Sequence, residues 1–312
     1  MTTFDDGLYQ YGGQPVGGLP VGADGRIFWV DPSSGIGLAD PAGIDSNDGL
    51  TPSTAKKTLQ AAVDLCEDWR GDLIICKAGT ESVSATVTLD VKGLTVMSEH
   101  MGGNRPYLGE RFVIYGSHTD APAVTISAPC SIIGMGFTGS ETAGASVEVD
   151  GSLGGFDSGE FWEIRNCHFT HWAIAKAYAL LILGSGSGKV TGCTFDGLTA
   201  GYTTSAIGLD NSGAQSVVAL EISNNTFTNI GSGKYCIQLV DSAVKFNISR
   251  VEHNYVQSAG SLFIAFNSAT SNSSTLICDN FVGTATDATT YDDTVSNLKT
   301  AGFLFSGNHY SE

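Results

Sequence analysis

The sequence has few positive charges and no long hydrophobic run. Lys and Arg together number 15 against 32 Asp and Glu, so the 312-residue chain has a formal net charge of −17. Nucleic-acid binding draws on clustered positive charge that neutralises phosphates, and this chain has no such surplus. The richest apolar stretch, residues 177–183, is far shorter than the roughly 18 residues that cross a bilayer. These absences predict a protein that binds neither nucleic acid nor a membrane.

Signals for secretion, metal binding and a disulfide framework are also missing. The N-terminal sequence MTTFDDGLYQYGGQPVGG has neither the basic start nor the apolar run of a signal peptide, so we expect synthesis in the cytoplasm. The seven cysteines form no Cys-x-x-Cys pair, and no Cys/His cluster has the spacing of zinc ligands. We therefore expect mostly buried, apolar thiols, and neither a metal ion nor a cofactor.

Glycine, in contrast, is abundant. There are 40 Gly in 312 residues, while 42% of the chain is apolar and only 15% is charged. A disordered chain has lower hydrophobicity and denser charge, which excludes that class. The eight prolines and the lack of a Gly-x-y period exclude a collagen. The composition predicts a folded protein with a sizeable core and many turns.

Three segments of the chain differ in pattern. Residues 1–26 are rich in Gly and Pro and lack a sustained period, so we expect an extended arm. Its aromatic residues Phe4, Tyr9 and Tyr11 are expected to anchor the protein by ordering against a partner. Residues 27–70 read as a first strand over 27–30, a turn and a helix, and residues 71–312 read as short strands separated by turns.

One amphipathic helix is predicted from Ser53 onwards. Apolar residues recur there with helical spacing: Leu59, Ala62, Val63, Cys66 and Trp69. Gly71 is expected to end the helix. A repetitive β-structure exposes its core and its strand edges at the first repeat, and a helix is one way to cover them. We therefore expect this helix to be the N-terminal cap, with Leu59, Val63 and Cys66 plugging the end of the core.

Seven similar hexapeptides follow one another along the rest of the chain. Each has an apolar first residue, a small or flexible fourth residue, and an aromatic residue or Val near its end; they begin at Ile132, Ile164, Val190, Ile222, Val251, Ile277 and Phe305. The fourth position advances by 32, 26, 32, 29, 26 and 28 residues. This step is too variable for a tight solenoid and too short for propeller blades of roughly 40 to 45 residues. It predicts an all-β fold, a right-handed parallel β-helix with three short strands in each coil.

The fourth position of the repeat is predicted to form a ladder at a bend between two sheets. The residues in question are Cys167, Cys193, Asn225, Asn254, Asn280 and Asn308. A buried Asn can bond both the backbone and the Asn of the next coil, and a Cys fits the same small space. The apolar residues on either side are expected to point inward and stack on their equivalents about 4.8 Å away.

The initial segment resembles that of a known superfamily. The stretch IFWVDPSSG, followed by GIDSNDGLTPSTAKKTLQAAVDLCEDWRGDLIICKAGTESV, is similar to the start of right-handed β-helix proteins of the pectate-lyase-like superfamily. The resemblance covers residues 27–85, with Ala78 where the family usually has Pro. More narrowly, the short Gly/Pro arm and the Cys at the end of the helix look like virion structural proteins of tailed bacteriophages. The resemblance implies a parallel β-helix and a component of a phage particle.

Motifs for catalysis are incomplete. Hydrolysis of a glycosidic bond needs two carboxylates on one groove, and the available acids are not paired in a motif: Glu163, Asp196, Asp210, Glu221 and Asp241. The GSGSGK sequence at 184–189 is not a phosphate loop, because Leu183 and Val190 stand where Gly and Ser or Thr are required. We interpret it as a flexible turn between coils.

A short acidic loop has half of a calcium-binding pattern. Asp45, Asn47, Asp48 and Gly49 have the spacing of the first half of such a loop, but Lys56 replaces the Glu that completes it. We interpret the loop as a turn in which Asp and Asn side chains bond backbone amides. No catalytic, cofactor-binding or metal-binding residue is assigned from the sequence.

The sequence leads to one expected function and two alternatives. We expect a non-enzymatic virion protein, a capsid decoration or spike protein, that forms a parallel homotrimer and is attached through its arm to the major capsid protein or another virion protein. The first alternative is a tailspike-like receptor-binding protein that cleaves polysaccharide in a groove, with aromatic residues along it: Trp162, Trp172, Tyr202 and Tyr291. The second alternative is a non-catalytic module that binds host surface glycans through the same residues.

Overall fold

The computed structural model consists almost wholly of short strands. It describes residues 9–11, 14–16, 24–32, 43–99, 111–117, 121–139, 144–151, 160–170, 177–184, 187–197, 204–210, 217–231, 234–239, 246–247, 249–257, 262–266, 276–282, 304–306 and 309–310. Within these residues, neither helix has the length or the hydropathy of a membrane span.

Three large sheets, here called sheets I, II and III, contain most of the strands. Sheet I consists of β3 (Ile27–Val30), β4 (Leu73–Cys76), β7 (Leu94–Ser98), β10 (Cys130–Ile133), β13 (Phe161–Arg165), β16 (Ser187–Thr191), β20 (Leu220–Ser223), β24 (Arg250–Glu252), β27 (Leu276–Cys278) and β29 (Leu304–Ser306). Sheet II consists of β5 (Gly79–Val83), β8 (Phe112–Gly116), β11 (Gly136–Gly139), β14 (His168–Thr170), β17 (Thr194–Asp196), β21 (Thr226–Thr228), β25 (Tyr255–Gln257), β28 (Phe281–Val282) and β30 (His309–Tyr310). Sheet III consists of β6 (Val87–Leu89), β9 (Val124–Ile126), β12 (Ala145–Asp150), β15 (Tyr178–Leu183), β18 (Ser205–Asp210), β22 (Tyr235–Leu239) and β26 (Leu262–Phe266).

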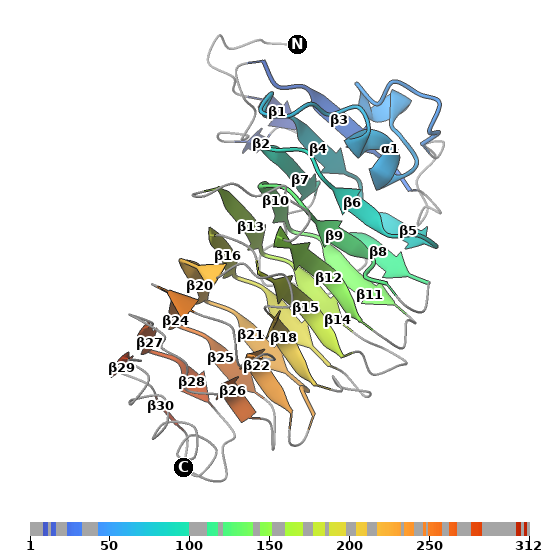
Figure 1. The fold of residues 1–312 in the computed structure, drawn as a ribbon. Coiled ribbons are helices and arrows are strands. Elements are labelled where there is room, and N and C mark those ends of the chain that lie inside the picture. Colours follow the sequence, from blue (N-terminus) through green and yellow to red (C-terminus); the bar gives the residue numbers. More distant parts are fainter. Residues whose placement is uncertain are drawn as a thin grey trace.

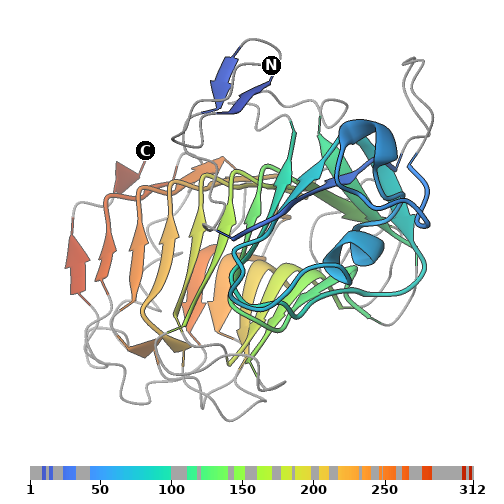
Figure 2. The same ribbon diagram turned by 90° about the horizontal axis from the view of Figure 1, so that it is seen from above.

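The chain visits the three sheets in turn, once per coil. Strands β10, β11 and β12, for example, belong to sheets I, II and III, and β13 returns to sheet I beside β10. Within the three sheets every described pairing is parallel, and successive coils stack along the molecule from β3 to β29 (Figures 1 and 2). The predicted parallel β-helix is confirmed. The arrangement is typical of a right-handed one, because crossovers between parallel strands are almost always right-handed.

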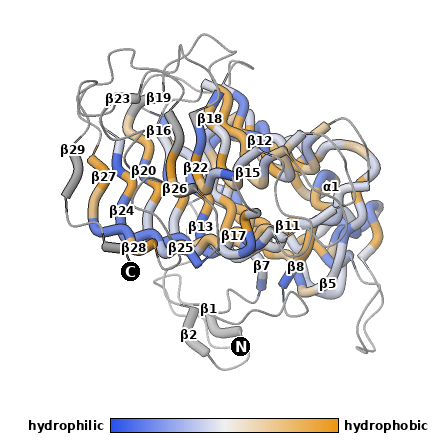
Figure 3. Tube along the Cα trace, turned by 90° about the horizontal axis from the view of Figure 1, so that it is seen from below, coloured by the Kyte–Doolittle hydropathy of each residue, from blue (hydrophilic) through white to orange (hydrophobic). Residues whose placement is uncertain are grey.

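The register matches the predicted repeat residue by residue. The first positions of the seven hexapeptides are partners of one another in sheet I: Ile132, Ile164, Val190, Ile222, Val251, Ile277 and Phe305. In sheet II, Phe137, Phe169, Phe195 and Phe227 stack in the interior with ring centroids 5.0, 4.8 and 5.1 Å apart. Hydrophobic and hydrophilic residues alternate along these strands (Figure 3), so each strand directs one face into a continuous core.

A left-handed residue makes the bend between sheets I and II. The third position of the hexapeptide has a positive φ in each described coil: Gly134 (72°), Asn166 (55°), Gly192 (65°), Asn224 (56°), His253 (54°) and Asp279 (53°). Gly adopts this conformation freely, and Asn, Asp and His are the other residues that enter it most often. The third position of the repeat is therefore restricted to residues that adopt a positive φ. This constraint adds to those on the apolar and the small positions.

The next residue of each bend forms the ladder. Asn225 and Asn254 are about 1% exposed, and Asn280 is fully buried. Asn254 Nδ2 donates to Asn280 Oδ1 at 2.9 Å, and Asn225 Nδ2 donates to Asn254 Oδ1 at 3.0 Å. Each of these oxygens also accepts the backbone N–H of the preceding ladder residue at 3.0 Å. Asn308 lies outside the described residues.

Cysteine continues the same pattern toward the N-terminus. Asn225 Oδ1 accepts the N–H of Cys193 at 2.9 Å. Cys167 Sγ and Cys193 Sγ donate weakly to the carbonyls of Ile132 and Ile164, at 3.8 and 3.6 Å. The Asn side chains donate to the equivalent carbonyls one coil back: Val190, Ile222 and Val251. We expected these cysteines only to fill the small space of the ladder position. Their thiols also form weak hydrogen bonds there.

The helix predicted over 53–69 is much shorter in the structure. Helix α1 covers only Leu59–Val63, and the preceding residues Pro52–Thr54 form a separate 3₁₀ turn, η1. Leu59 and Val63 are buried in the core at the first coil, and Cys66 packs against it partly buried. Trp69 is not on the apolar face, because it is 64% exposed and has a φ of 58°.

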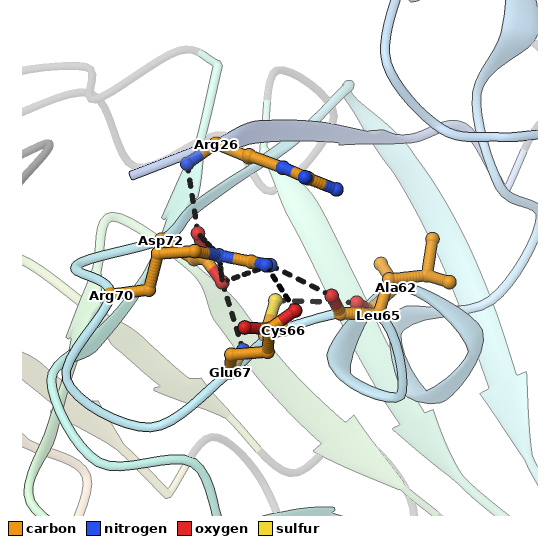
Figure 4. A network of polar contacts seen from close by, with 7 residues as sticks. All are labelled: Arg26, Ala62, Leu65, Cys66, Glu67, Arg70 and Asp72. Carbon is orange, nitrogen blue, oxygen red and sulfur yellow. Dashed lines mark hydrogen bonds and ion pairs between the residues drawn. The ribbon is translucent and has the colours of Figure 1, made fainter. Parts of the chain in front are cut away.

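A buried carboxylate organises the chain after α1. The buried carboxylate of Asp72 accepts the N–H of Glu67 at 2.9 Å and that of Arg26 at 2.8 Å (Figure 4). Arg70 bonds both oxygens of the same carboxylate and also the carbonyl of Leu65. These bonds hold residues 65–72 as a tight loop, although the local apolar spacing favours a longer helix.

The outer face of sheet I is apolar at its first strands. Leu73, Ile75, Met97 and Ile133 point away from the interior, yet they are buried in a cluster of their own. Trp29 is partly buried against this second cluster. The molecule therefore has apolar side chains on both faces of sheet I near α1, whereas farther along the same outer face carries charged residues.

The N-terminal arm contains a described hairpin. Strands β1 (Tyr9–Tyr11) and β2 (Gln14–Val16) pair antiparallel, with Tyr9 opposite Val16 and Tyr11 opposite Gln14. The two strands thus pair with each other within the arm. Phe4 lies outside the described residues.

Two further expectations fail at one place in the core. Residues 187–189 of the GSGSGK segment belong to strand β16 (Ser187–Thr191), so its second half is not a flexible turn. Gly188 is the register partner of Trp162, and Trp162 is completely buried instead of lining a groove. A Cβ on Gly188 would lie 2.1 Å from the indole ring of Trp162. Gly188 thus leaves the space that the indole fills.

We predict that Gly188→Ala destabilises the coil between β13 and β16. The added methyl group must displace the buried indole of Trp162, and overpacking of this kind costs about 1–3 kcal/mol. Denaturant unfolding of the purified protein measures the loss. The neighbouring change Ser187→Ala, in the same strand, is expected to stay within about 0.5 kcal/mol; equal effects of the two variants would refute the explanation.

We also predict that Asn254→Ala weakens the ladder. The change leaves the N–H of Asn225 and the carbonyl of Ile222 buried without their partners. We expect a loss of about 2 kcal/mol or more in the free energy of unfolding, measured by urea titration. Thr226→Ala, an outward-facing change in sheet II, is the control and should be nearly neutral. A neutral result for Asn254→Ala would show that the ladder does not stabilise the fold.

Candidate functional site

The acids selected from the sequence lie on different faces of the molecule. Glu163 and Glu221 are on the outer face of sheet I, Asp196 is in sheet II and Asp210 is at the end of β18 in sheet III. Asp241 lies outside the described residues. Among the four acids that the structure describes, only Glu163 and Glu221 lie on the same face.

Basic residues separate and neutralise these two acids. Glu163, Lys189, Glu221 and Arg250 are consecutive register partners, so acidic and basic side chains alternate along sheet I. Lys189 Nζ lies 2.8 Å from Glu221 Oε1. Burial acts to raise the pKa of Glu221, but the hydrogen bonds from Lys189 and Ser223 outweigh it and leave the pKa below its usual value. Glu221 therefore stays ionised and is poorly suited to donate a proton.

A different pair of carboxylates lies on the outer face of sheet III. Glu148 and Asp150 belong to β12, where Val147 and Val149 alternate with them and are completely buried. Two residues of a strand advance by roughly 6.6 Å. The two carboxylates are therefore neighbours on one face of the sheet, and hydrolysis of a glycosidic bond needs two carboxylates on one groove.

The environment of Glu148 favours its protonated form. Burial raises the pKa of Glu148 above its usual value, and the negative charge of Asp150 raises it further. A carboxyl group with a raised pKa, beside a second carboxylate, is one way in which a site supplies a general acid. This pair is the strongest candidate for chemistry in the described part of the chain.

Neighbouring coils add polar and aromatic groups to this face. The ring of Tyr178 lies over Gly208, since a Cβ there would come within 2.5 Å of Tyr178 Cδ1. Gln238 follows Gly208 in the same register row, and its Oε1 is buried without a hydrogen bond from any described residue. The face thus offers two carboxylates, an aromatic ring and an unsatisfied acceptor, all within four coils.

The sequence contains a signal for Glu148 and Asp150 that our search did not use. In the segment SVEVD, at 146–150, apolar and acidic residues alternate, which places both acids on one face of a strand. Known catalytic motifs do not select this alternation. Of the four aromatic residues expected along a groove, Trp162 is in the core, and the others, Trp172, Tyr202 and Tyr291, lie outside the described residues.

The acidic loop at 45–49 forms a turn. Asp48 Oδ1 accepts the N–H of Leu50 at 3.0 Å, and Gly49 has a φ of 73°. Lys56 Nζ donates to the carbonyl of Asp45 at 2.7 Å, so an ammonium group lies where a cation would bind. Across the described residues, no group of three or more His, Cys, Asp or Glu has the arrangement of a metal site.

Comparisons with known proteins add little to this geometry. No family model matches the sequence, and no curated protein matches it. Among solved structures, XylC in complex with xylose is 10% identical, with 91% of this chain and 83% of that chain covered and a TM-score of 0.32. The native GH136 lacto-N-biosidase from Eubacterium ramulus is 11% identical, with 92% of this chain and 67% of that chain covered and a TM-score of 0.26. Likenesses this distant carry no argument about function, and the fold rests on the strand register.

Proposed function

We propose that this protein is a non-enzymatic structural component of a bacteriophage particle. In this proposal it is a rigid spike or capsid decoration protein, a parallel homotrimer that stands on the virion. Residues 1–26 attach it to the major capsid protein or to another virion protein. The resemblance of the short Gly/Pro arm, and of the Cys at the end of the predicted helix, to virion structural proteins of tailed bacteriophages motivates the proposal.

The unbroken register of the coils is the observation that most supports a structural role. Inward residues of sheet I stay in register from β3 to β29, and the ladder adds buried hydrogen bonds at the bend. Such a stack is stiff because each coil is held by both neighbours. The neutralised charges on sheet I also fit a solvent-facing surface better than a proton-transfer site.

The structural role predicts a trimer and a place on the particle. Light scattering after size-exclusion chromatography should give three times the mass of the chain at micromolar concentration. Gold-labelled antibodies should decorate intact phage particles in electron micrographs, and deletion of residues 1–26 should abolish the decoration. A monomer in solution, or labelling only of free protein, would contradict the corresponding part of the proposal.

Glu148 and Asp150 favour one alternative, a receptor-binding protein that cleaves polysaccharide. In this alternative Glu148 protonates the leaving oxygen of the glycosidic bond, and Asp150 activates the water that attacks the sugar. Binding of host surface glycans without cleavage is the remaining alternative, and it would use the same face of sheet III.

An assay of reducing ends on host capsule or lipopolysaccharide distinguishes these functions. If the protein is an enzyme, Glu148→Gln should lower the rate by at least about a hundredfold. Glu163→Gln, on sheet I, should leave the rate unchanged. The structural proposal predicts no product from any of several polysaccharides. Saturable binding of a glycan without product would instead favour the non-catalytic alternative.

A further inference from the structure

A buried carboxylate, Glu81, lies where the cap meets the first coil. Glu81 belongs to β5, and its register partner in the next coil is Ile114, which is in turn the partner of Phe137. Glu81 therefore occupies an inward position in a row that is otherwise apolar in these coils. Only 6% of its surface is exposed. A charge at such a position is costly unless a partner compensates it.

The single described partner of this carboxylate is a neutral backbone group. Glu81 Oε2 accepts the N–H of Leu59, the first residue of α1, at 2.9 Å. In the described part of the chain no Lys, Arg or His forms an ion pair with Glu81. The cap helix is thus bonded directly to an acid in the core of the first coil.

The other titratable groups near Glu81 do not compensate its charge. Asp45 lies at the start of α1, where its Oδ1 accepts the N–H groups of Lys57 and Thr58 at 2.9 and 2.8 Å. The thiol of Cys76, in β4, is completely buried and also interacts with Glu81. The ammonium group of Lys56 donates to the carbonyl of Asp45.

The proton of Glu81 is held more tightly than that of an ordinary glutamic acid. Burial raises the pKa of Glu81 to about 7; the hydrogen bond from Leu59 lowers it, and the charge of Asp45 raises it. When the cap opens, the carboxyl group meets water and its pKa returns toward the usual 4.5. The closed cap therefore binds more protons than the open one between about pH 4.5 and 7.

We propose that protonation of Glu81 controls how firmly α1 seals the N-terminal end of the β-helix. With Glu81 protonated, the cap is closed over the core. As the pH rises toward neutrality the group ionises, the closed state loses stability relative to the open one, and the loss is complete above about pH 7. Opening then exposes the apolar residues that Leu59 and Val63 cover.

The proposal is independent of the role of the protein in a particle. It rests on the position of Glu81, on its bond to Leu59 and on the lack of a described cation beside it. The device is local, because the other coils are held by the core rows and the ladder.

Hydrogen exchange of the full chain at pH 5.5 and pH 8.5 tests the proposal. After correction for the intrinsic exchange rate, protection of residues 59–66 should fall by roughly tenfold or more at the higher pH. Glu81→Gln keeps the shape and an acceptor for the N–H of Leu59 but does not ionise, so its corrected protection should be the same at both pH values. Glu67→Gln changes an exposed acid of the same region and should behave as the unmodified protein does.

Thermal unfolding gives a second readout, which stays informative if Glu81→Gln also changes the overall stability of the protein. The difference in melting temperature between Glu81→Gln and the unmodified protein should increase from pH 5.5 to pH 8.5, in favour of the variant. An equal pH dependence of cap protection in the unmodified protein and in Glu81→Gln would overturn the proposal. So would a constant difference in melting temperature across this range.

Discussion

The parallel pairing of each coil with the next is the constraint on which the rest of this structure depends. Strands about 4.8 Å apart place equivalent side chains in contact, so an inward position must suit its neighbours in both directions. The phenylalanine row from Phe137 to Phe227 meets this demand by stacking like on like. The indole of Trp162 meets it differently, because its partner Gly188 has no side chain.

The bend between sheets I and II keeps this register while the coils differ in length. From Gly134 to Asp279, each described coil turns there through a left-handed residue followed by a buried residue, so the same bend recurs along this part of the stack. The corner is hydrophilic next to β25 and β28 (Figure 3), since the left-handed residues His253 and Asp279 face outward there. In these coils the insertions of different size lie elsewhere, as the varying step of the repeat requires.

Polar groups are placed according to what the stack tolerates. Sheet I carries alternating acids and bases on its outer face, where neighbouring coils pair them, as in the contact between Lys189 and Glu221. The buried acids are exceptional and have specific surroundings. Asp72 is bonded by Arg70 and by two backbone groups and remains ionised, whereas Glu81 has one neutral donor and readily keeps its proton. Glu148 is intermediate in its surroundings: it is on a partly covered outer face beside Asp150, and both burial and that neighbouring charge raise its pKa.

The sequence by itself determined the parallel β-helix, its repeat and the first strand at 27–30, because inward residues recur wherever one coil covers another. It also contained the alternation that places Glu148 and Asp150 on one face. Only the tertiary structure decided where α1 ends, since the loop after it is held by the carboxylate of Asp72, which bonds Glu67, Arg70 and the distant Arg26, and apolar spacing does not register these polar contacts. The same holds for Trp162, whose place in the core depends on a glycine in the next coil, and for Glu81, which is buried between the cap helix and the next coil. Periodicity identifies which residues share a face, but only the neighbouring coil decides what that face touches.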